Sequence, residues 1–387
     1  MGGGARVKVT RVDGLSGVDA AAWDALAGED DPFAEHAFLS ALEDSGSVGG
    51  RSGWRATHVL VHDEGRLVGA LPLYRKDHSY GEYIFDFAWA NASSRLGAPY
   101  YPKLVAMTPL TPATGTRFLV HPDADRERVV CALLDGAIDA AAALRASSVH
   151  LNFLNASEAD EVAAHGGYLA RTTHQFHFHN EGYADFEAFV ARFRSSMRKK
   201  LRKERRAVAE SGLDVGVVAG PQLSEDDWSR LRRFYLDTCW RKGSEPYLTE
   251  RFFTLLAERC AARVLVGYAR RNGLLVAASL NFQKGKHLYG RYWGCEEDQE
   301  MLHFELCYYQ LIEHAIAHGM TRFEAGAQGT HKLRRGLMPS AIHSAHFIAH
   351  PVLRDAVADY LPREHAAELR EMEALAEHGP FRRGDEA

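Results

Sequence analysis

An internal repeat is the strongest constraint on how this chain folds, because a duplicated segment implies that one structural unit occurs twice. Residues 65–74 (GRLVGALPLY) align with residues 273–282 (GLLVAASLNF), and residues 80–83 (YGEY) align with residues 289–292 (YGRY). Seven of these fourteen positions are identical, and the offset between the copies is 208 and then 209 residues. The chain, at 387 residues, is also longer than most single domains. We therefore expect two related domains, at 1–170 and 171–387.

Both halves show the same order of apolar segments: a strand, a turn with a glycine, a second strand, a helix and a final strand. In the first half the predicted strands are 57–62 and 147–153 and the helix is 126–145; in the second half the strands are 263–269 and from 321, and the helix is 304–318. This order predicts an α/β (α+β) fold, with a mixed sheet and helices on both faces. The repeat also predicts that Tyr80, Glu82 and Asp86 lie on a third strand, equivalent to the strand with Tyr289, Arg291 and Trp293.

Composition excludes several classes of protein. A hydrophobic fraction of 46% and a formal net charge of −5 are ordinary for a globular protein and do not indicate an overall nucleic-acid binder or a disordered chain. The five cysteines are scattered, without a CxxC pair, which favours a reducing environment. No apolar run has the length of a signal peptide or of the roughly 20-residue segment that spans a membrane. We expect a cytoplasmic protein without a membrane span.

Several motifs along the chain resemble one family. They are His78–Tyr83 (HSYGEY), Tyr100–Leu104 (YYPKL), Thr111–Gly115 (TPATG), Gly290–Cys295 (GRYWGC), Leu302–Glu305 (LHFE) and Gly326–Lys332 (GAQGTHK). Together they resemble the FemAB-like (peptidoglycan biosynthesis or recognition) group of the GNAT acyltransferase superfamily, and the second half resembles the Fem-type transferases. The resemblance implies tandem GNAT-like domains in a Fem-type architecture. No long heptad insertion interrupts the second half, so we expect no coiled-coil arm.

The resemblance implies an N-acyltransferase that forms an amide between an activated acyl donor and an amine of a small molecule or peptide. The donor expected is an acyl-CoA or acyl carrier protein thioester, used as a co-substrate without a tightly bound cofactor. Two alternatives stay open: an aminoacyltransferase that uses aminoacyl-tRNA, and a non-catalytic protein that recognises a peptide or cell-wall precursor. The absence of a GxSxG motif and of a convincing catalytic cysteine favours direct transfer, without a covalent enzyme intermediate.

Candidate catalytic residues lie in the second half, which we expect to contain the active site. His303 and Glu305 stand at the start of the predicted helix, where either could act as a base, although Glu305 could instead complement the helix dipole. Glu324 lies on a strand of small and apolar residues, where a carboxylate is costly unless paired. It is therefore either catalytic or part of an ion pair with an arginine. Lys332 resembles the lysine of the Phe-Lys pair in Fem proteins, which implies contact with a substrate phosphate or the reacting carbonyl; His331 replaces the phenylalanine.

The first domain is expected to form a structural wall of a cleft that contributes to substrate binding. The residues predicted to bind substrate are Tyr80, Glu82, Asp86, Lys103, Arg291, Trp293, Gln328, His331 and Arg335. Residues 192–206 contain nine basic residues and one acidic residue with helical spacing of the apolar positions. In this helix Arg198, Lys199 and Arg202 are candidates for binding the phosphate groups of a donor, such as transfer RNA or acyl carrier protein; the alternative is a solvated basic face.

Two patterns argue against other chemistry. The loop 295–300, which corresponds to the pyrophosphate-binding loop of ordinary GNAT enzymes, contains four carboxylates that would repel coenzyme A. His177 and His179 lie on one face of a predicted strand, but no third ligand is near in the sequence, so no metal site is expected.

Overall fold

The computed structural model describes residues 7–296, 299–327 and 329–382, which form two compact units. Unit 1 contains the chain up to Thr173 together with Ala341–Leu369, and unit 2 contains His174–Ser340 and the chain from Arg370. This division differs from the predicted one, which assigned everything after residue 170 to the second domain. The reason lies in strand pairing, because β15 (Met338–Ile348) pairs antiparallel with β8 (Ser148–Leu154) of unit 1 over residues 343–348.

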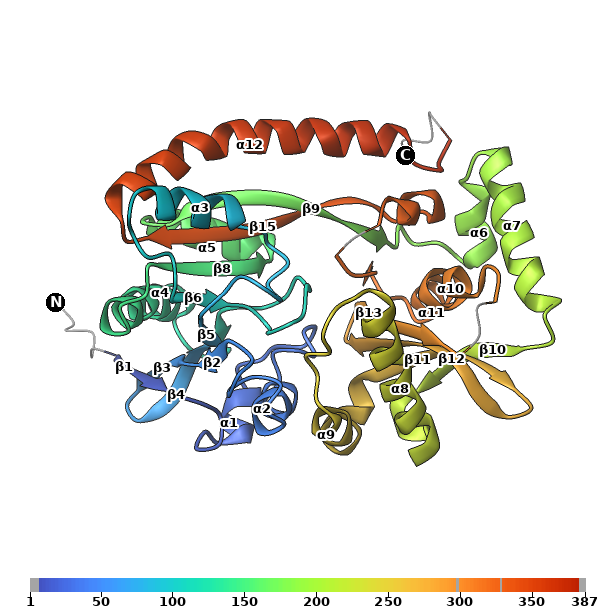
Figure 1. Ribbon diagram of the computed structural model, residues 1–387, viewed down its shortest axis with the longest axis horizontal. Helices are drawn as coiled ribbons and strands as arrows, with labels where there is room; N and C mark the ends of the chain where they lie inside the picture. The colour runs from blue at the N-terminus through green and yellow to red at the C-terminus, as the bar shows by residue number, and fades with distance from the viewer. Residues whose placement is uncertain (1–6, 297–298, 328, 383–387) are drawn as a thin grey trace. The chain divides into compact units, whose positions relative to one another are not determined.

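Unit 1 contains two groups of paired strands (Figure 1). The first group has the order β1-β3-β4-β7, and the second has the order β15-β8-β6-β5-β2. Their bounds are β1 Lys8–Val12, β2 Trp54–Ala56, β3 His58–Asp63, β4 Arg66–Leu71, β5 Leu73–Lys76, β6 Lys103–Ala106, β7 Leu119–Val120, β8 Ser148–Leu154 and β15 Met338–Ile348. The pair β6 and β8 is parallel, whereas β5 and β6 are antiparallel.

The helices of unit 1 cover apolar sheet faces. They are α1 Ala20–Asp24, α2 His36–Asp44, α3 Phe87–Arg95, α4 Arg126–Ala143 and α5 Ala156–His165, and the first part of α12 Pro351–Glu377 also belongs to this unit. The α4 helix buries its Val129, Leu133 and Ala137 stripe in a core shared with β3, β4 and β8. This stripe has the i, i+4, i+8 spacing of one helix face, which explains why the predicted helix at 126–145 forms here.

Unit 2 contains one group of strands in the order β10-β11-β12-β13-β14-β9, antiparallel except for the pair β13 and β14. The bounds are β9 Leu169–His179, β10 Asp214–Ala219, β11 Val264–Arg271, β12 Leu274–Lys284, β13 His287–Cys295 and β14 Arg322–Glu324. The helices are α6 Phe186–Ala191, α7 Ser195–Ala209, α8 Glu225–Arg241, α9 Glu250–Cys260, α10 Leu302–Phe304 and α11 Gln310–Ala317. Short 3-10 turns are η1 Gly220–Gln222, η2 Ala261–Arg263 and η4 Thr330–Arg335.

A π-helix, η3 Glu305–Tyr309, joins α10 to α11. Its Leu306 carbonyl accepts a hydrogen bond from the Ser279 hydroxyl of β12 at 2.8 Å. A Cβ atom at Gly267 of β11 would lie 2.8 Å from the same carbonyl, so only glycine allows this close approach. The π-helix thus packs directly against the sheet, and such turns occur frequently at functional sites.

The first block of the repeat has the same turn in both units. Glu64 and Gly65 between β3 and β4 have φ angles of 48° and 85°, and Asn272 and Gly273 between β11 and β12 have φ angles of 52° and 82°. Two successive positive φ angles are the requirement of a type I′ hairpin turn, which explains the glycine in both copies.

The second block of the repeat has different structures in the two copies. Tyr289 and Arg291 lie on β13, as predicted, but Tyr80–Tyr83 lies in a loop between β5 and α3. The predicted third strand of the first half is therefore wrong. This loop does not form a strand ladder because its polar groups are bound by two buried lysines, as described below.

Candidate functional site

Three short segments of unit 2 bring aromatic and imidazole rings together: α10, the π-helix and η4. The His331 ring lies 6.0 Å from the His303 ring and 5.8 Å from the Tyr308 ring, measured between centroids. The Tyr308 hydroxyl and His331 Nε2 are at hydrogen-bond distance, 2.9 Å. Trp293 of β13 packs edge-on against His303 at 5.2 Å. We refer to His303, Phe304, Tyr308, His331 and Lys332 as the imidazole cluster.

Both imidazoles of this cluster are held in the neutral form. Burial, followed by the charges of His331 and Arg335, lowers the pKa of His303 to about 4. Burial, followed by the charges of Arg335 and Lys332, also lowers the pKa of His331. Near pH 7 each ring therefore has a nitrogen lone pair that can accept a proton.

Lys332 is a buried cation, with 2% of its surface exposed. Its Nζ donates a hydrogen bond to the Gly326 carbonyl at 2.6 Å. Burial lowers the pKa of Lys332 to about 8, an effect that Cys307 opposes, and among the described residues no carboxylate contributes to the shift. At pH 7 the ammonium group is therefore mostly protonated, and the hydrogen-bond partner that the described residues give it is a backbone carbonyl.

The structure pairs both predicted catalytic carboxylates with arginine. Glu305 Oε1 accepts hydrogen bonds from Arg205 Nε and Nη2, at 3.1 and 3.0 Å. Glu324 of β14 forms an ion pair with Arg322, whose Nε lies 3.1 Å from Oε1. On the other side of Glu324, His177 Nε2 lies 3.7 Å from Oε2. The ion-pair alternative that the sequence left open for Glu324 is therefore present, and Glu305 has the same kind of partner.

Three further residues of unit 2 were predicted to bind substrate: Arg335, Arg291 and Gln328. The Arg335 guanidinium lies 3.3 Å above the centroid of the Phe304 ring and donates to the His331 carbonyl at 2.8 Å. Arg291 donates to the Tyr292 hydroxyl at 3.2 Å on β13, two residues before Trp293. Gln328 lies outside the described residues.

The predicted basic helix is α7, and its outer face is exposed. The exposed cations on this face are Lys199, Lys200, Arg202, Lys203 and Arg206. Arg202 donates to Glu187 at 2.8 Å, and the half-buried Arg198 donates to the Ala191 carbonyl at 3.1 Å. The face therefore keeps a positive charge that a phosphate-bearing molecule could use.

The acidic loop before α10 is partly balanced by arginines of α8. Glu296 Oε1 pairs with Arg230 Nη1 at 3.0 Å and is also in contact with Arg233. Glu297 and Asp298 lie outside the described residues. Glu296, one of the four carboxylates predicted to repel coenzyme A, is therefore paired with arginines.

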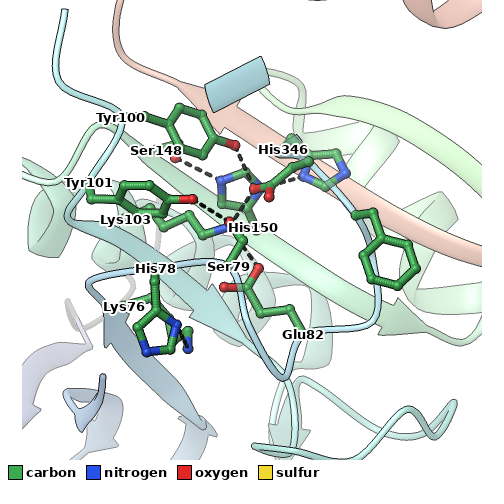
Figure 2. Close-up of polar contacts among 12 residues, drawn as sticks. Lys76, His78, Ser79, Glu82, Tyr100, Tyr101, Lys103, Ser148, His150 and His346 are labelled. Atoms are coloured by element: carbon green, nitrogen blue, oxygen red, sulfur yellow. Dashed lines mark hydrogen bonds and ion pairs between the residues drawn. The ribbon is translucent and has the colours of Figure 1, made fainter. Parts of the chain in front are cut away.

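Unit 1 brings Glu82 and Lys103 together in its interior (Figure 2). Asp86 is buried in the same place, in contact with Lys103. The fully buried Lys103 Nζ donates to Glu82 Oε2 at 2.7 Å, to Ser79 Oγ at 2.9 Å and, through a close contact, to Asp86 Oδ2. The Tyr100 hydroxyl donates to the same Asp86 oxygen at 2.6 Å. We refer to Ser79, Glu82, Asp86, Tyr100 and Lys103 as the Lys103 cluster. Of the first-unit residues predicted to bind substrate, only Tyr80 lies outside it, with 71% of its surface exposed.

The charges of the Lys103 cluster depend on one another. Burial opposes ionisation of Asp86, but the charges of Lys103 and His150 and the hydrogen bonds from Lys103 and Ser79 together outweigh it and lower the pKa of Asp86 to about 2. For Glu82 burial prevails over Lys103, and the pKa rises to about 7. Burial alone would lower the pKa of Lys103, yet the two carboxylates raise it. The cluster thus holds one firmly ionised carboxylate, one that titrates near neutrality, and a permanent cation.

A second buried lysine, missed in the sequence analysis, lies beside this cluster. Lys76 of β5 is the antiparallel register partner of Lys103 on β6. Its Nζ donates to the Tyr80 carbonyl at 2.9 Å and lies 3.9 Å above the Trp54 ring. Burial lowers the pKa of Lys76 to about 7. Two paired lysines therefore bind the loop between β5 and α3, which is why the loop is not a strand.

A buried pair of histidines was also missed. His150 of β8 and His346 of β15 are cross-strand partners, with Nδ1 atoms 2.7 Å apart (Figure 2). Ser148 lies 2.8 Å from the other nitrogen of His150, and Ser344 lies 3.0 Å from that of His346. A short contact between two ring nitrogens requires one donor and one acceptor, so at most one of the rings is protonated at this nitrogen. No sequence motif signals this pair, because its members are far apart in the chain.

Two searches over the described part of the chain bear on other functions. They find no group of three or more metal-ligating side chains, and no helix that is long and apolar enough to cross a bilayer.

The fold is shared with solved structures of low sequence identity. FemX has 12% identity and a TM-score of 0.54, with 88% of this chain and 97% of FemX covered. The C-terminal domain of a putative lysylphosphatidylglycerol synthetase from Agrobacterium fabrum also has 12% identity and a TM-score of 0.54, with 87% and 93% covered. L-PGS from Bacillus licheniformis has 10% identity and a TM-score of 0.50, with 87% and 98% covered. The predicted tandem, Fem-type α/β architecture is thereby confirmed.

A search of proteins with curated functions gave no significant match. The sequence does match the FemAB-like family, described as peptidoglycan biosynthesis/recognition, over residues 14–383. The family description, peptidoglycan biosynthesis/recognition, and the shared fold support the predicted enzyme class, a transferase of acyl or aminoacyl groups. The match covers nearly the whole chain, and the protein therefore belongs to the FemAB-like family.

Proposed function

We propose that this protein transfers an acyl or aminoacyl group to the amine of a small molecule or peptide, and that the transfer takes place at the imidazole cluster of unit 2. The observation that carries this proposal is the environment of Lys332. Within the described residues this buried ammonium group has a carbonyl rather than a carboxylate as its hydrogen-bond partner, so no described carboxylate offsets its positive charge. Such a charge is suited to stabilise an oxyanion that develops beside it.

In this reaction the amine nitrogen attacks the carbonyl carbon of the donor. A C–N bond forms, the carbonyl oxygen becomes an oxyanion, and the C–S bond of a thioester or the C–O bond of an ester then breaks. Lys332 stabilises the oxyanion. The proton lost by the amine passes to a neutral imidazole, His331 or His303, and then to the leaving sulfur or oxygen. Because Glu305 and Glu324 are paired with arginines, neither is assigned the role of base.

We propose a phosphate-bearing donor because the exposed face of α7 is basic. Its cations lie on one side of a single helix, and a phosphate-bearing donor supplies the opposite charge. Acyl-CoA, acyl carrier protein and aminoacyl-tRNA all carry phosphate. Aminoacyl-tRNA is the second candidate, and the extent of the face favours it, because a long polyanion can contact several of these cations at once.

The acceptor is proposed to be an amine of a peptide, such as a cell-wall precursor. Membership of a family described as peptidoglycan biosynthesis/recognition supports this choice. The same family description includes recognition, so a non-catalytic recognition protein is the alternative outcome of the test.

The test is mass spectrometry of the purified full chain incubated with pools of acyl-CoA, acylated carrier protein and aminoacyl-tRNA, each with amine and peptide acceptors. We expect a new amide product from one donor class. The Lys332→Met variant should lower the rate at least 100-fold, the typical loss when one oxyanion-stabilising group is removed. Lys8→Met, at an exposed lysine of β1, is the matched control and should keep the wild-type rate.

The proposal fails if no donor class gives product with the wild-type protein. It also fails if Lys332→Met and Lys8→Met have the same rate. Product from aminoacyl-tRNA with none from the thioesters would select the second donor.

A further inference from the structure

The buried face of α7 contains a carboxylate that the proposed chemistry does not use. Leu201, Glu204 and Val208 form this face, and all three are at most 5% exposed. A carboxylate in the middle of an apolar helix stripe is costly to bury unless it is paired and hydrogen-bonded. Glu204 therefore needs partners, and the partners are what connect α7 to the imidazole cluster.

Glu204 Oε2 has two donors from two different segments. The Tyr309 hydroxyl of the π-helix donates to it at 2.5 Å, and Arg335 Nη2 of η4 donates to it at 2.9 Å. Arg335 in turn holds the backbone of His331 through its Nη1. The neighbour of Tyr309, Tyr308, is at hydrogen-bond distance from the His331 ring.

These contacts form a closed ring of interactions. It runs from Glu204 through Arg335 to the His331 backbone, and from the His331 ring through Tyr308 and Tyr309 back to Glu204. Both the backbone and the side chain of His331 are therefore positioned relative to α7. Lys332 is the next residue, so its direction depends on the same ring.

The adjacent residue of α7 makes a parallel connection. Arg205 donates to Glu305, the first residue of the π-helix, and to Glu313 of α11 at 2.8 Å. Two successive residues of one helix thus hold η4 and the π-helix, while the outer face of the same helix carries the exposed cations. The helix joins the proposed donor-binding face to the proposed reaction centre.

We propose that Glu204 is a positioning residue: through Arg335 and Tyr309 it orients His331 and Lys332, and it couples the basic face of α7 to the imidazole cluster. The effect of Glu204 on the transfer reaction rests on the proposed function. The geometry of His331 can be measured without any substrate. A positioning role predicts a change in the titration of His331 that loss of packing alone does not produce.

The direction in which the pKa of His331 should change follows from the charges that face its ring. These charges are Lys332 and Arg335 on η4. The neighbouring titratable groups are His303 on α10 and Tyr308 on the π-helix, and Lys242, which follows α8, acts on His303. In the native protein Glu204 balances the charge of Arg335. The Glu204→Gln variant keeps the shape of the side chain but leaves Arg335 unbalanced. A positive charge beside an imidazole disfavours its protonated form, so His331 should titrate at a lower pH.

The experiment is a pH titration of the histidine resonances by NMR in the full chain, with the His331 signal identified by its loss in His331→Gln. In Glu204→Gln the midpoint for His331 should move to lower pH by roughly half a pH unit or more, as expected when one nearby charge is removed. Glu187→Gln is the matched control, because it removes an exposed carboxylate that binds the outer face of the same helix through Arg202. It should leave the His331 midpoint unchanged.

A transfer assay with the active donor forms the second arm. Glu204→Gln should lower kcat about tenfold or more with little change in the KM for donor, whereas Arg202→Ala should raise that KM and leave kcat nearly unchanged. If no donor is active, the proposed function fails while the titration still decides the role of Glu204.

If Glu204→Gln does not fold, Arg335→Lys takes its place, because it keeps the charge but loses the fork that joins Glu204 to the His331 carbonyl. It should lower kcat and alter the His331 resonance without lowering the KM for donor. An unchanged His331 titration in a folded Glu204→Gln protein, or an equal effect of Glu187→Gln, overturns the inference.

Discussion

Replacing Lys103 by methionine should make the stability of unit 1 strongly dependent on pH. Methionine keeps the approximate length of the side chain and removes its charge. In the native protein the ammonium group makes contacts with Glu82, Asp86 and Ser79, and all three partners are buried. The variant therefore leaves two carboxyl groups without their cation, in a place that water does not reach.

The magnitude follows from the pKa values of the two acids. The fall in the pKa of Asp86 from 3.8 to about 2 corresponds to about 2 kcal/mol of native stability. This stability is present above pH 4 and is lost as the pH falls through the folded value. The raised pKa of Glu82, about 7, has the opposite sign, since it costs stability as the pH rises from about 4.5 to 7.

Without Lys103 burial is the dominant influence on the pKa values of both acids, opposed by Lys76 near Glu82 and by His150 and Ser79 near Asp86. The loss of stability should be about 3 to 5 kcal/mol at pH 8, the usual cost of removing one partner from a buried ion pair. At pH 4.5 both acids can take up a proton, and the loss should fall to about 1 to 2 kcal/mol, the cost of the remaining unpaired polar groups.

The assay is hydrogen exchange of the peptides that contain β5 and β6, combined with urea unfolding, at pH 4.5 and pH 8. Arg126→Met is the control in the same unit, because it removes the partly exposed ion pair with Glu161 and should cost less than about 1 kcal/mol at either pH. An equal loss of stability at the two pH values would refute the reasoning, because it would mean that the carboxylates are not left charged and unpaired.

Three further predictions concern unit 2. The transfer rate should fall as the pH rises through about 8, where Lys332 loses its proton, and Lys332→Arg should remove this limb of the pH profile. Replacing Arg198, Lys199 and Arg202 together by alanine should raise the KM for a phosphate-bearing donor and flatten its dependence on salt, without changing thermal stability by more than a few degrees. Gly294→Ala should cost about 1 to 3 kcal/mol in urea unfolding, because its Cβ would lie 2.5 Å from the Phe234 side chain; Gly17→Ala, with open space around it, is the control.

Local features of this protein follow from its sequence because they depend on neighbours in the chain. The hairpin turns at Gly65 and Gly273 need two successive residues with positive φ, and glycine at the second position signals them. The α7 helix follows from the spacing of Leu201 and Val208 among basic residues. The motifs that indicated a FemAB-like protein are likewise contiguous segments, and the family match over residues 14–383 confirms that reading.

The repeat was a less reliable guide beyond its first block. Identity between Tyr80–Tyr83 and Tyr289–Tyr292 predicted a strand in both copies, but only the second copy is one. In the first copy Lys76 donates a hydrogen bond to the Tyr80 carbonyl and Lys103 donates one to Ser79, so the loop is held by side chains rather than by a strand partner. Sequence similarity could not reveal this, since the two lysines lie outside the repeated block of four residues.

The roles of individual charged groups were decided by partners distant in the chain. Glu305 is bound by Arg205, one hundred residues earlier, and Glu204 by Arg335, 131 residues later. His150 and His346 meet across two strands that are 196 residues apart. The sequence alone determined that the chain repeats a hairpin, carries a basic amphipathic helix and has the family's motifs. Which carboxylates are paired, and which lysine is hydrogen-bonded to a carbonyl instead, depended on the tertiary structure, because ion pairing depends on distance in space rather than in sequence.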